Sequence, residues 1–329
     1  MRPAGKFRLG MTRVIILLLT VVGLIGAALI VGSVGVEPVI AAIRAIGVGG
    51  YVVYVAYTAI VLGLLGAAWR AVAPGGGPIG AYVWARTVRE GATDVLPFAQ
   101  IGGLVVGGRA LTAQRVPSDL AYASMIADLT TEMASQLIFT LFGVGALLLA
   151  LGGGFDSGGV LKLVLGGLGL TCALLAALAF GQQPMLSAAA RIGERLLPAS
   201  VTGLAAVQSR LAAIYRDRAA LAWSFGFNLA AWVASGIGAW LALRLMGVAI
   251  GPVAVLAIES LIFAVRSIAF VVPGALGVQE GAYLLLAPLF GLDPQVAVAL
   301  SLLKRARDLT IGVPALLWWQ ASEGRKLLA

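Results

Sequence analysis

Residues 119–150 have the sequence DLAYASMIADLTTEMASQLIFTLFGVGALLLA, which decides the fold class of this chain. A helix rises about 1.5 Å per residue, so this stretch can cross the roughly 30 Å hydrocarbon core of a bilayer. Its second half is mostly apolar, whereas its first half carries Asp119, Asp128 and Glu132. The stretch therefore predicts a membrane-crossing helix that carries ionisable side chains.

Long apolar stretches recur along the chain between residues 13 and 319. Of the 329 residues, 60% are hydrophobic and 11% are charged, whereas soluble domains carry about a quarter charged residues. We therefore predict one all-α polytopic integral membrane domain over residues 1–329, with about seven or eight transmembrane helices. The expected spans are 13–32, 50–69, 119–150, 160–181, 220–246, 252–272 and 295–319.

The net charge of +9 comes from Lys and Arg residues grouped between the apolar stretches. This placement follows the positive-inside rule, and the basic residues before the first span predict a cytoplasmic N-terminus. No basic stripe is interleaved with stacking aromatic residues, so nucleic acid is not an expected partner. Because the chain has no histidine and one cysteine, Cys172, we expect no His-based catalysis, no intrachain disulfide, no metal site and no cofactor.

Two apolar segments, 97–108 and 273–291, are interrupted by Gly and Pro. Such segments either re-enter the same side of the membrane or cross it. If 273–291 is re-entrant, the C-terminus lies outside; if it crosses, both termini are cytoplasmic. Residues 79–94 combine Tyr82 and Trp84 with two arginines. That mixture predicts a helix lying in the membrane interface.

The sequence around the first segment resembles the sequence around the second. Each has two prolines about twenty residues apart and then Asp-Leu-Thr, at 128–130 and at 308–310. This pattern favours an internal repeat with halves at about 13–181 and 220–319, linked by an amphipathic cytoplasmic stretch at 185–218. The alternative is chance similarity in a chain rich in Gly, Ala and Leu.

The candidate site residues are ionisable side chains within apolar spans, where a charge costs about 2.5–3.5 kcal/mol even on lenient scales. Asp128 and Glu132 are one helical turn apart and therefore share a helix face. Glu259 and Arg266 are two turns apart on the span 252–272. A third group lies near the middle of the last span and consists of Lys304, Arg305, Arg307 and Asp308.

Two other interpretations of these charges remain open. The half of 119–150 that carries Asp128 and Glu132 could be cytoplasmic and solvated, or the charges could form a purely structural salt-bridge network. The last group has three cations and one anion. Its surplus of positive charge predicts a counter-charge from Glu259, from Glu280 or from an anionic ligand.

The segment 273–291 carries the sharpest local motif, with Pro273 and Gly274 followed by Gly277 and Glu280. Proline ends a helix, and glycine allows the backbone to approach a ligand closely. The freed backbone amides and Glu280 could then face a polar group in a cavity.

These motifs, in the order Glu259, Arg266, Pro273-Gly274, Gly277, Glu280 and then the charged group at 304–308, resemble the lysylphosphatidylglycerol synthase transmembrane, or flippase-like, family. The resemblance covers about residues 10–320 and is nearest to the hopanoid-biosynthesis-associated subgroup. It implies a multi-pass protein of the bacterial inner membrane that binds lipids or moves them between leaflets. A lipid-modifying aminoacyltransferase would need a further soluble domain, which we do not find in these 329 residues, so that activity is not expected.

The sequence therefore predicts lipid translocation or lipid binding, with membrane lipids, hopanoids among them, as the expected partners. Two alternatives remain: a membrane-embedded lipid pyrophosphatase-type enzyme, and a non-transporting scaffold for lipid-biosynthetic enzymes. Against the enzyme, no Gly-x-Ser-x-Gly, His-Glu-x-x-His or Asp-rich prenyl-diphosphate motif is present. The lipid, the direction, the energy source and the oligomeric state are not determined by the sequence.

Overall fold

The computed structural model describes residues 36–95, 99–151, 198–268 and 277–328, together with a few isolated positions. Regular structure within these residues is helical and contains no β-strand, which confirms the all-α class. The predicted span 13–32 lies outside the described residues, and so does nearly all of the predicted span 160–181.

The described helices have the following bounds. In chain order they are α2 (Val36–Ala71), α3 (Ile79–Val95), α4 (Ala99–Thr112), α5 (Ser118–Leu151), α7 (Pro198–Arg216), α8 (Arg218–Leu245), α9 (Pro252–Ile268), α10 (Val278–Leu286), the short 3₁₀ helix η2 (Ala287–Phe290) and α11 (Pro294–Leu328).

Three of the described helices are long and apolar enough to cross a membrane: Arg44–Ala71, Ser118–Ala150 and Arg218–Leu245. They coincide with the predicted spans 50–69, 119–150 and 220–246, so membrane-crossing helices are supported. In α11 the charged group at 304–308 interrupts the apolar pattern, and α9 has only 17 residues. A total of seven or eight spans stays a prediction.

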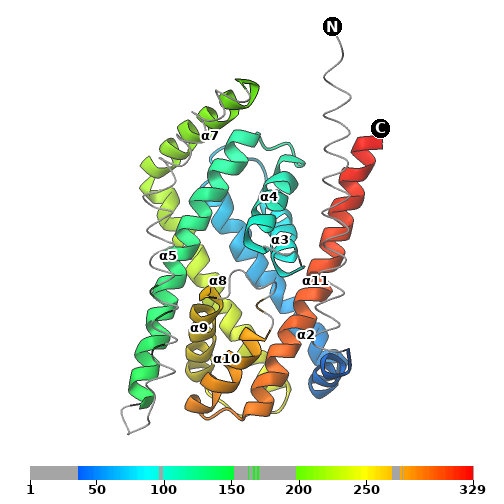
Figure 1. The fold of residues 1–329 in the computed structure, drawn as a ribbon, viewed down its shortest axis with the longest axis vertical. Helices are drawn as coiled ribbons and strands as arrows, with labels where there is room; N and C mark the ends of the chain where they lie inside the picture. The colour runs from blue at the N-terminus through cyan, green and yellow to red at the C-terminus, as the bar shows by residue number, and fades with distance from the viewer. Residues whose placement is uncertain are drawn as a thin grey trace.

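The bundle has a core at each end. Figure 1 places α3 and α4 toward one end, and α9 and α10 toward the other, with α2, α5, α8 and α11 running along the length between them. One core gathers buried residues of the end of α2, of α3 and α4, and of the first half of α5, including Trp69 and Tyr82. The second gathers those of α9, α10 and the first part of α11, including Tyr283. Each short-helix pair therefore has a core of its own.

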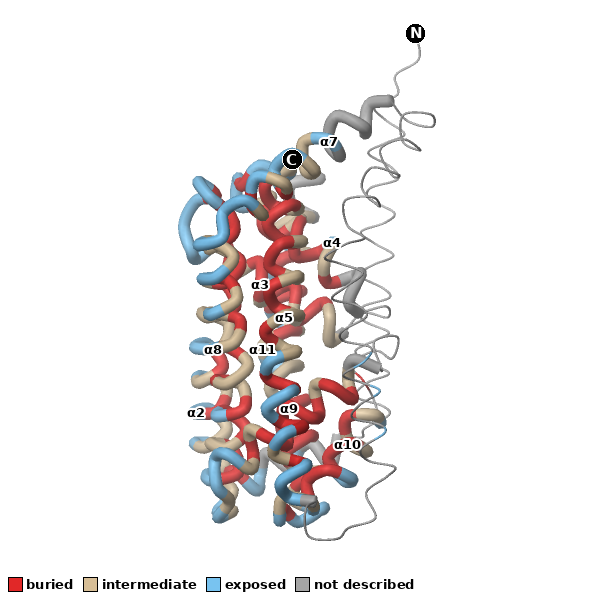
Figure 2. Tube along the Cα trace, turned by 90° about the vertical axis from the view of Figure 1, so that its left-hand side faces the viewer, coloured by how far each residue is buried: buried red, intermediate tan, exposed pale blue. Residues whose placement is uncertain are grey.

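The outer surface of the bundle is apolar over long stretches. Val52, Val53 and Ile60 on α2 are exposed, and so are Leu149 on α5 and Trp318 on α11. In Figure 2 the outer positions of α2 and α8 are exposed, while buried positions concentrate on the inner helices. Many large exposed apolar side chains are expected on a lipid-facing surface.

The prediction of an interfacial helix at 79–94 is wrong. This segment is α3, which packs against α2, α4 and α11, and its residues Tyr82, Arg86 and Arg89 are buried. The amphipathic pattern is real, but the polar side faces acidic side chains of α5 instead of water or lipid headgroups.

The segments 97–108 and 273–291 contain short helices. The first holds most of α4, which packs on α3, and the second holds α10 and η2, which pack on α9 and α11. Whether each segment is re-entrant stays a prediction. Of the predicted linker 185–218, residues 198–216 form α7, and residues 185–197 lie outside the described residues.

Two glycines allow α3 and α11 to touch backbone to backbone. A Cβ built on Gly91 would lie 2.8 Å from the Cα of Gly312, and the reverse construction gives the same distance. Real Cβ atoms are essentially never found so near another atom. Any larger residue at either position must therefore push the two helices apart.

We predict that Gly91→Ala lowers the free energy of unfolding by about 1–3 kcal/mol, because an overpacked contact costs that much. The gain in helix propensity, about 1 kcal/mol, only partly offsets this loss. Thermal unfolding of the purified protein in detergent measures the change. Gly63→Ala on α2 is the matched control, since a Cβ there meets nothing within 4 Å. Equal stability of the two variants would contradict the close contact.

Candidate functional site

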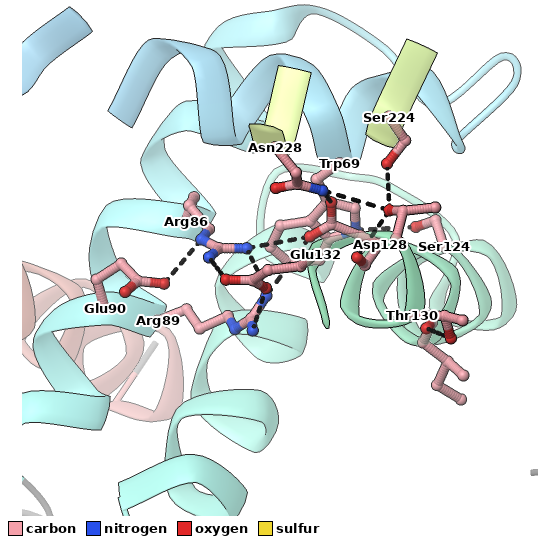
Figure 3. Close-up of polar contacts among 12 residues, drawn as sticks. Trp69, Arg86, Arg89, Glu90, Ser124, Asp128, Thr130, Glu132, Ser224 and Asn228 are labelled. Atoms are coloured by element: carbon pink, nitrogen blue, oxygen red, sulfur yellow. Dashed lines mark hydrogen bonds and ion pairs between the residues drawn. The ribbon is translucent and has the colours of Figure 1, made fainter. Parts of the chain in front are cut away.

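The first group of buried charges joins α3 to α5. Arg86 Nη1 lies 3.1 Å from Asp128 Oδ2 and 3.1 Å from Glu132 Oε2, and Arg86 Nη2 pairs with Glu132 Oε1. Arg89 Nη2 adds a contact of 3.0 Å to Glu132 Oε2, and Arg86 Nε lies 2.7 Å from Glu90 Oε1. Figure 3 shows the Arg86 guanidinium between the three carboxylates. Asp128 and Glu132 are buried, so they do not form a solvated helix face.

Polar side chains of α2 and α8 complete this first group. Asn228 Nδ2 donates to Asp128 Oδ1 at 3.1 Å, so the other carboxylate oxygen is also hydrogen-bonded. Ser224 pairs with Thr131 at 2.7 Å, and Trp69 Nε1 donates to Ser124 Oγ at 3.0 Å. Side chains of α3, α5 and α8 therefore share one polar network around Asp128, and the Trp69–Ser124 bond joins α2 to α5 one helical turn before Asp128.

The second group lies in the other half of the chain and consists of Glu259 on α9, Tyr283 on α10 and Lys304 on α11. The Lys304 ammonium pairs with Glu259 Oε2 and donates to the Tyr283 hydroxyl at 3.0 Å. Tyr283 in turn donates to Glu259 Oε1. All three side chains are buried, and the Lys304 ammonium also lies 5.6 Å from the ring centre of Phe263. We call these three residues the α9–α11 triad.

The third group links the start of α10 to α11. Arg305 Nε lies 2.7 Å from Glu280 Oε1, and Arg305 Nη2 lies 3.1 Å from Glu280 Oε2, so the pair is bidentate. Glu280 also accepts the backbone N–H of Gly277 at 2.9 Å and the hydroxyl of Ser301 at 3.2 Å. Gly277 has a φ of 74°, which a glycine adopts without strain. The Glu280 side chain is 19% exposed, unlike the fully buried Glu259.

The remaining predicted residues lie near these groups. Arg307 pairs with the neighbouring Asp308 at 2.6 Å, and its Nη1 donates to the Tyr54 hydroxyl of α2 at 3.1 Å. Arg266, near the end of α9, is half-buried and lies within electrostatic range of Asp94 on α3. Pro273 and Gly274 lie outside the described residues.

Protein side chains supply the counter-charges for the last-span cations. Lys304 pairs with Glu259, Arg305 with Glu280 and Arg307 with Asp308. The sequence analysis expected a counter-charge from Glu259, from Glu280 or from an anionic ligand. The structure contains both carboxylates in this role. The positive charge of α11 alone gives no reason to require an anionic ligand.

The structure adds partners that the sequence analysis did not select. Arg86 and Arg89 were assigned to an interfacial helix, although their spacing of three residues on an apolar background was a usable signal. Tyr283, Asn228 and Tyr54 carried no such signal, because a lone Tyr or Asn in an apolar helix does not reveal what it contacts. Among the described residues no cluster of three or more His, Cys, Asp or Glu could hold a metal ion.

A family model described as "Lysylphosphatidylglycerol synthase TM region" matches residues 14–315, which is most of the chain. No curated protein and no solved structure matches.

We predict that Arg86→Gln lowers the free energy of unfolding by about 3–5 kcal/mol, because it leaves two buried carboxylates without their main counter-charge. The matched control is Arg210→Gln, which removes the more exposed pair between Arg210 and Asp119, 2.9 Å apart. An exposed pair contributes at most about 1 kcal/mol, so the control should unfold nearly as the unmodified protein does. Chemical or thermal unfolding in detergent measures both, and equal losses would contradict a buried network.

Proposed function

This chain belongs to the lysylphosphatidylglycerol synthase transmembrane family, and we propose that it binds the headgroup of a membrane lipid and moves that lipid between leaflets. The family indicates a role connected with membrane lipids, and the described helices include three that can cross a bilayer. Lipid movement is the more specific part of the proposal, and the ion pair between Glu280 and Arg305 supports it.

The Glu280–Arg305 pair has the features of a headgroup site. It joins a nine-residue helix, α10, to a long one, and the Glu280 side chain is 19% exposed, whereas Glu259 and Lys304 of the α9–α11 triad are buried. Guanidinium binds carboxylate and phosphate with the same two-pronged geometry. A lipid phosphate could therefore replace Glu280 on Arg305, and a cationic or hydroxylated part of the headgroup could bind the released Glu280.

A site of this kind needs a path for a charged headgroup through a low-dielectric region. Ionisable side chains that could line such a path lie in all three groups of charges, on α3, α5, α9, α10 and α11. Such residues are costly in a membrane and commonly mark a substrate pathway. We propose the inner membrane as the location and a cytoplasmic N-terminus as the orientation, from the positive-inside pattern. Hopanoids are one candidate lipid class, from the resemblance of the sequence.

Proteoliposomes test the proposal directly. Purified protein is reconstituted with a labelled phosphatidylglycerol, an aminoacylated phosphatidylglycerol or a hopanoid, and the leaflet of each lipid is followed over time. We expect protein-dependent movement of at least one lipid. Movement of a phospholipid but not of the hopanoid would assign the substrate to the phosphate-bearing class, and the opposite result would assign it to hopanoids.

We predict that Glu280→Gln and Arg305→Ala each slow this movement by at least about tenfold, since the loss of one charge-assisted bond of about 1.5–3 kcal/mol has that effect. Asp119→Asn, which alters the exposed pair with Arg210, is the control and should move lipid at the unmodified rate. Unchanged movement in both site variants would remove these residues from the site.

If folded protein moves none of the lipids, translocation is wrong. Turnover of a lipid diphosphate that Glu280→Gln abolishes would then indicate the enzyme, and stable capture of lipid-biosynthetic enzymes without turnover would indicate the scaffold.

A further inference from the structure

Two buried ion pairs occupy the same places in two sets of helices. Arg86 is the eighth residue of α3, and Glu259 is the eighth residue of α9. Their partners Asp128 and Lys304 are likewise each the eleventh residue of their helices, α5 and α11, although the Asp-Leu-Thr repeat sets Asp128 against Asp308. One set is α3, α4 and α5, and the other is α9, α10 and α11; the short helices of the two sets lie toward opposite ends of the bundle (Figure 1). The charges, however, are exchanged: the short helix carries the cation in one set and the anion in the other.

The two pairs differ in a property that matters inside a membrane. Arginine does not lose its proton in proteins, so the first pair always keeps the positive charge of Arg86. Lysine can be neutral when it is buried, because its ammonium is a compact charge that a low dielectric disfavours. Only the second pair can therefore exist in a neutral form with no charge on either partner.

The geometry of the second pair provides a route for the proton. The Lys304 ammonium is 3.0 Å from the Tyr283 hydroxyl, and that hydroxyl donates to Glu259 Oε1. Lys304 also contacts Glu259 Oε2 directly. A tyrosine hydroxyl both donates and accepts, so it can take a proton from one side while it gives its own to the other.

We propose that the α9–α11 triad is a proton-exchange site that shares one proton between Lys304 and Glu259. In the transfer, an N–H bond of Lys304 breaks and an O–H bond forms at Tyr283. At the same time the original O–H bond of Tyr283 breaks and an O–H bond forms at Glu259 Oε1. The products are a neutral amine, an intact phenol and a carboxylic acid, so atoms and charge balance.

Several other groups face the triad and set the field in which the proton moves. Arg266 of α9, Arg307 of α11 and Tyr54 of α2 act on Lys304 or Tyr283. Asp308 interacts electrostatically with Tyr54. Asp94 of α3 interacts with Asp308 and therefore affects the triad only indirectly. Glu280 and Arg305, on α10 and α11, pair with each other beside the triad.

The proton matters because the triad closes the same interface as the proposed headgroup site. Glu280 and Tyr283 lie on α10, and Arg305 and Lys304 lie on α11. A headgroup that enters between α10 and α11 must part Tyr283 from Lys304, and it also parts Glu259 from Lys304 if α9, which packs on α10, moves together with α10. If the pair were ionised, parting it would leave two buried charges without counter-charges, which is costly. The neutral form avoids that cost, so the α10–α11 interface opens from the neutral form. The Arg86 pair has no neutral form, so the contact between α3 and α5 stays closed.

The proton-exchange site is testable without any lipid movement, and only its coupling to transport rests on the proposed function. The chain has four lysines, at positions 6, 162, 304 and 326. Solid-state NMR of ¹⁵N-lysine-labelled protein in liposomes distinguishes a neutral amine from an ammonium. We expect a neutral-amine resonance at neutral pH that is lost in Lys304→Arg and retained in Lys326→Arg. If Lys304 shows only ammonium at every pH at which the protein stays folded, the proposal is overturned.

A second measurement tests the coupling. Lys304→Arg keeps a cation opposite Glu259 but cannot form the neutral pair, so it should retain the thermal stability of the protein and slow lipid movement by at least about tenfold. A purely structural ion pair predicts that Lys304→Arg moves lipid at the unmodified rate, and that result would overturn the coupling. A neutral-amine signal in a protein that moves no lipid would instead uphold the proton site and refute the proposed function.

Discussion

A buried charge must have a counter-charge, and this requirement organises the described part of the molecule. Arg86 and Arg89 reach Asp128 and Glu132, Lys304 reaches Glu259, and Arg305 reaches Glu280. Every one of these pairs joins a short helix to a long one. Removing one member would leave its partner as an uncompensated charge in a low-dielectric environment. The ion pairs therefore help to fix which helices are neighbours, because lipid can replace an apolar contact but not a counter-charge.

Small residues make these pairs geometrically possible. Gly91 and Gly312 let α3 and α11 meet at their backbones, and Gly107 lies against the aliphatic part of Arg89. Close approach of helices is common in membrane proteins, because tight packing replaces the hydrophobic driving force that lipid removes. With side chains at these glycines, the short helices could not lie deep enough between the long ones for their charges to reach partners. The packing and the electrostatics thus depend on each other.

Much of the site could be predicted from the sequence, because an ionisable residue in an apolar helix is conspicuous. Asp128, Glu132, Glu259, Glu280 and the charges at 304–308 were found in this way. Their pairing was not, since partners such as Arg86 with Glu132 are far apart in sequence and their helices had first to be placed side by side. The same limit explains the wrong assignment of α3. Its two faces showed that it was amphipathic, but not that the polar face would meet acidic side chains.

The sequence by itself determined that this is a helical membrane protein, where three of its spans lie and which helices carry charge, because composition and periodicity are local properties. Only the tertiary structure decided which charge faces which. It showed that the surplus cations of α11 are matched by carboxylates on α9, on α10 and next to them in α11. It also showed that Arg86 of α3 reaches the carboxylates of α5 and that Lys304 of α11 reaches the carboxylate of α9. The physical reason is that an ion pair depends on distances of a few ångströms between side chains, and packing of the whole bundle sets those distances.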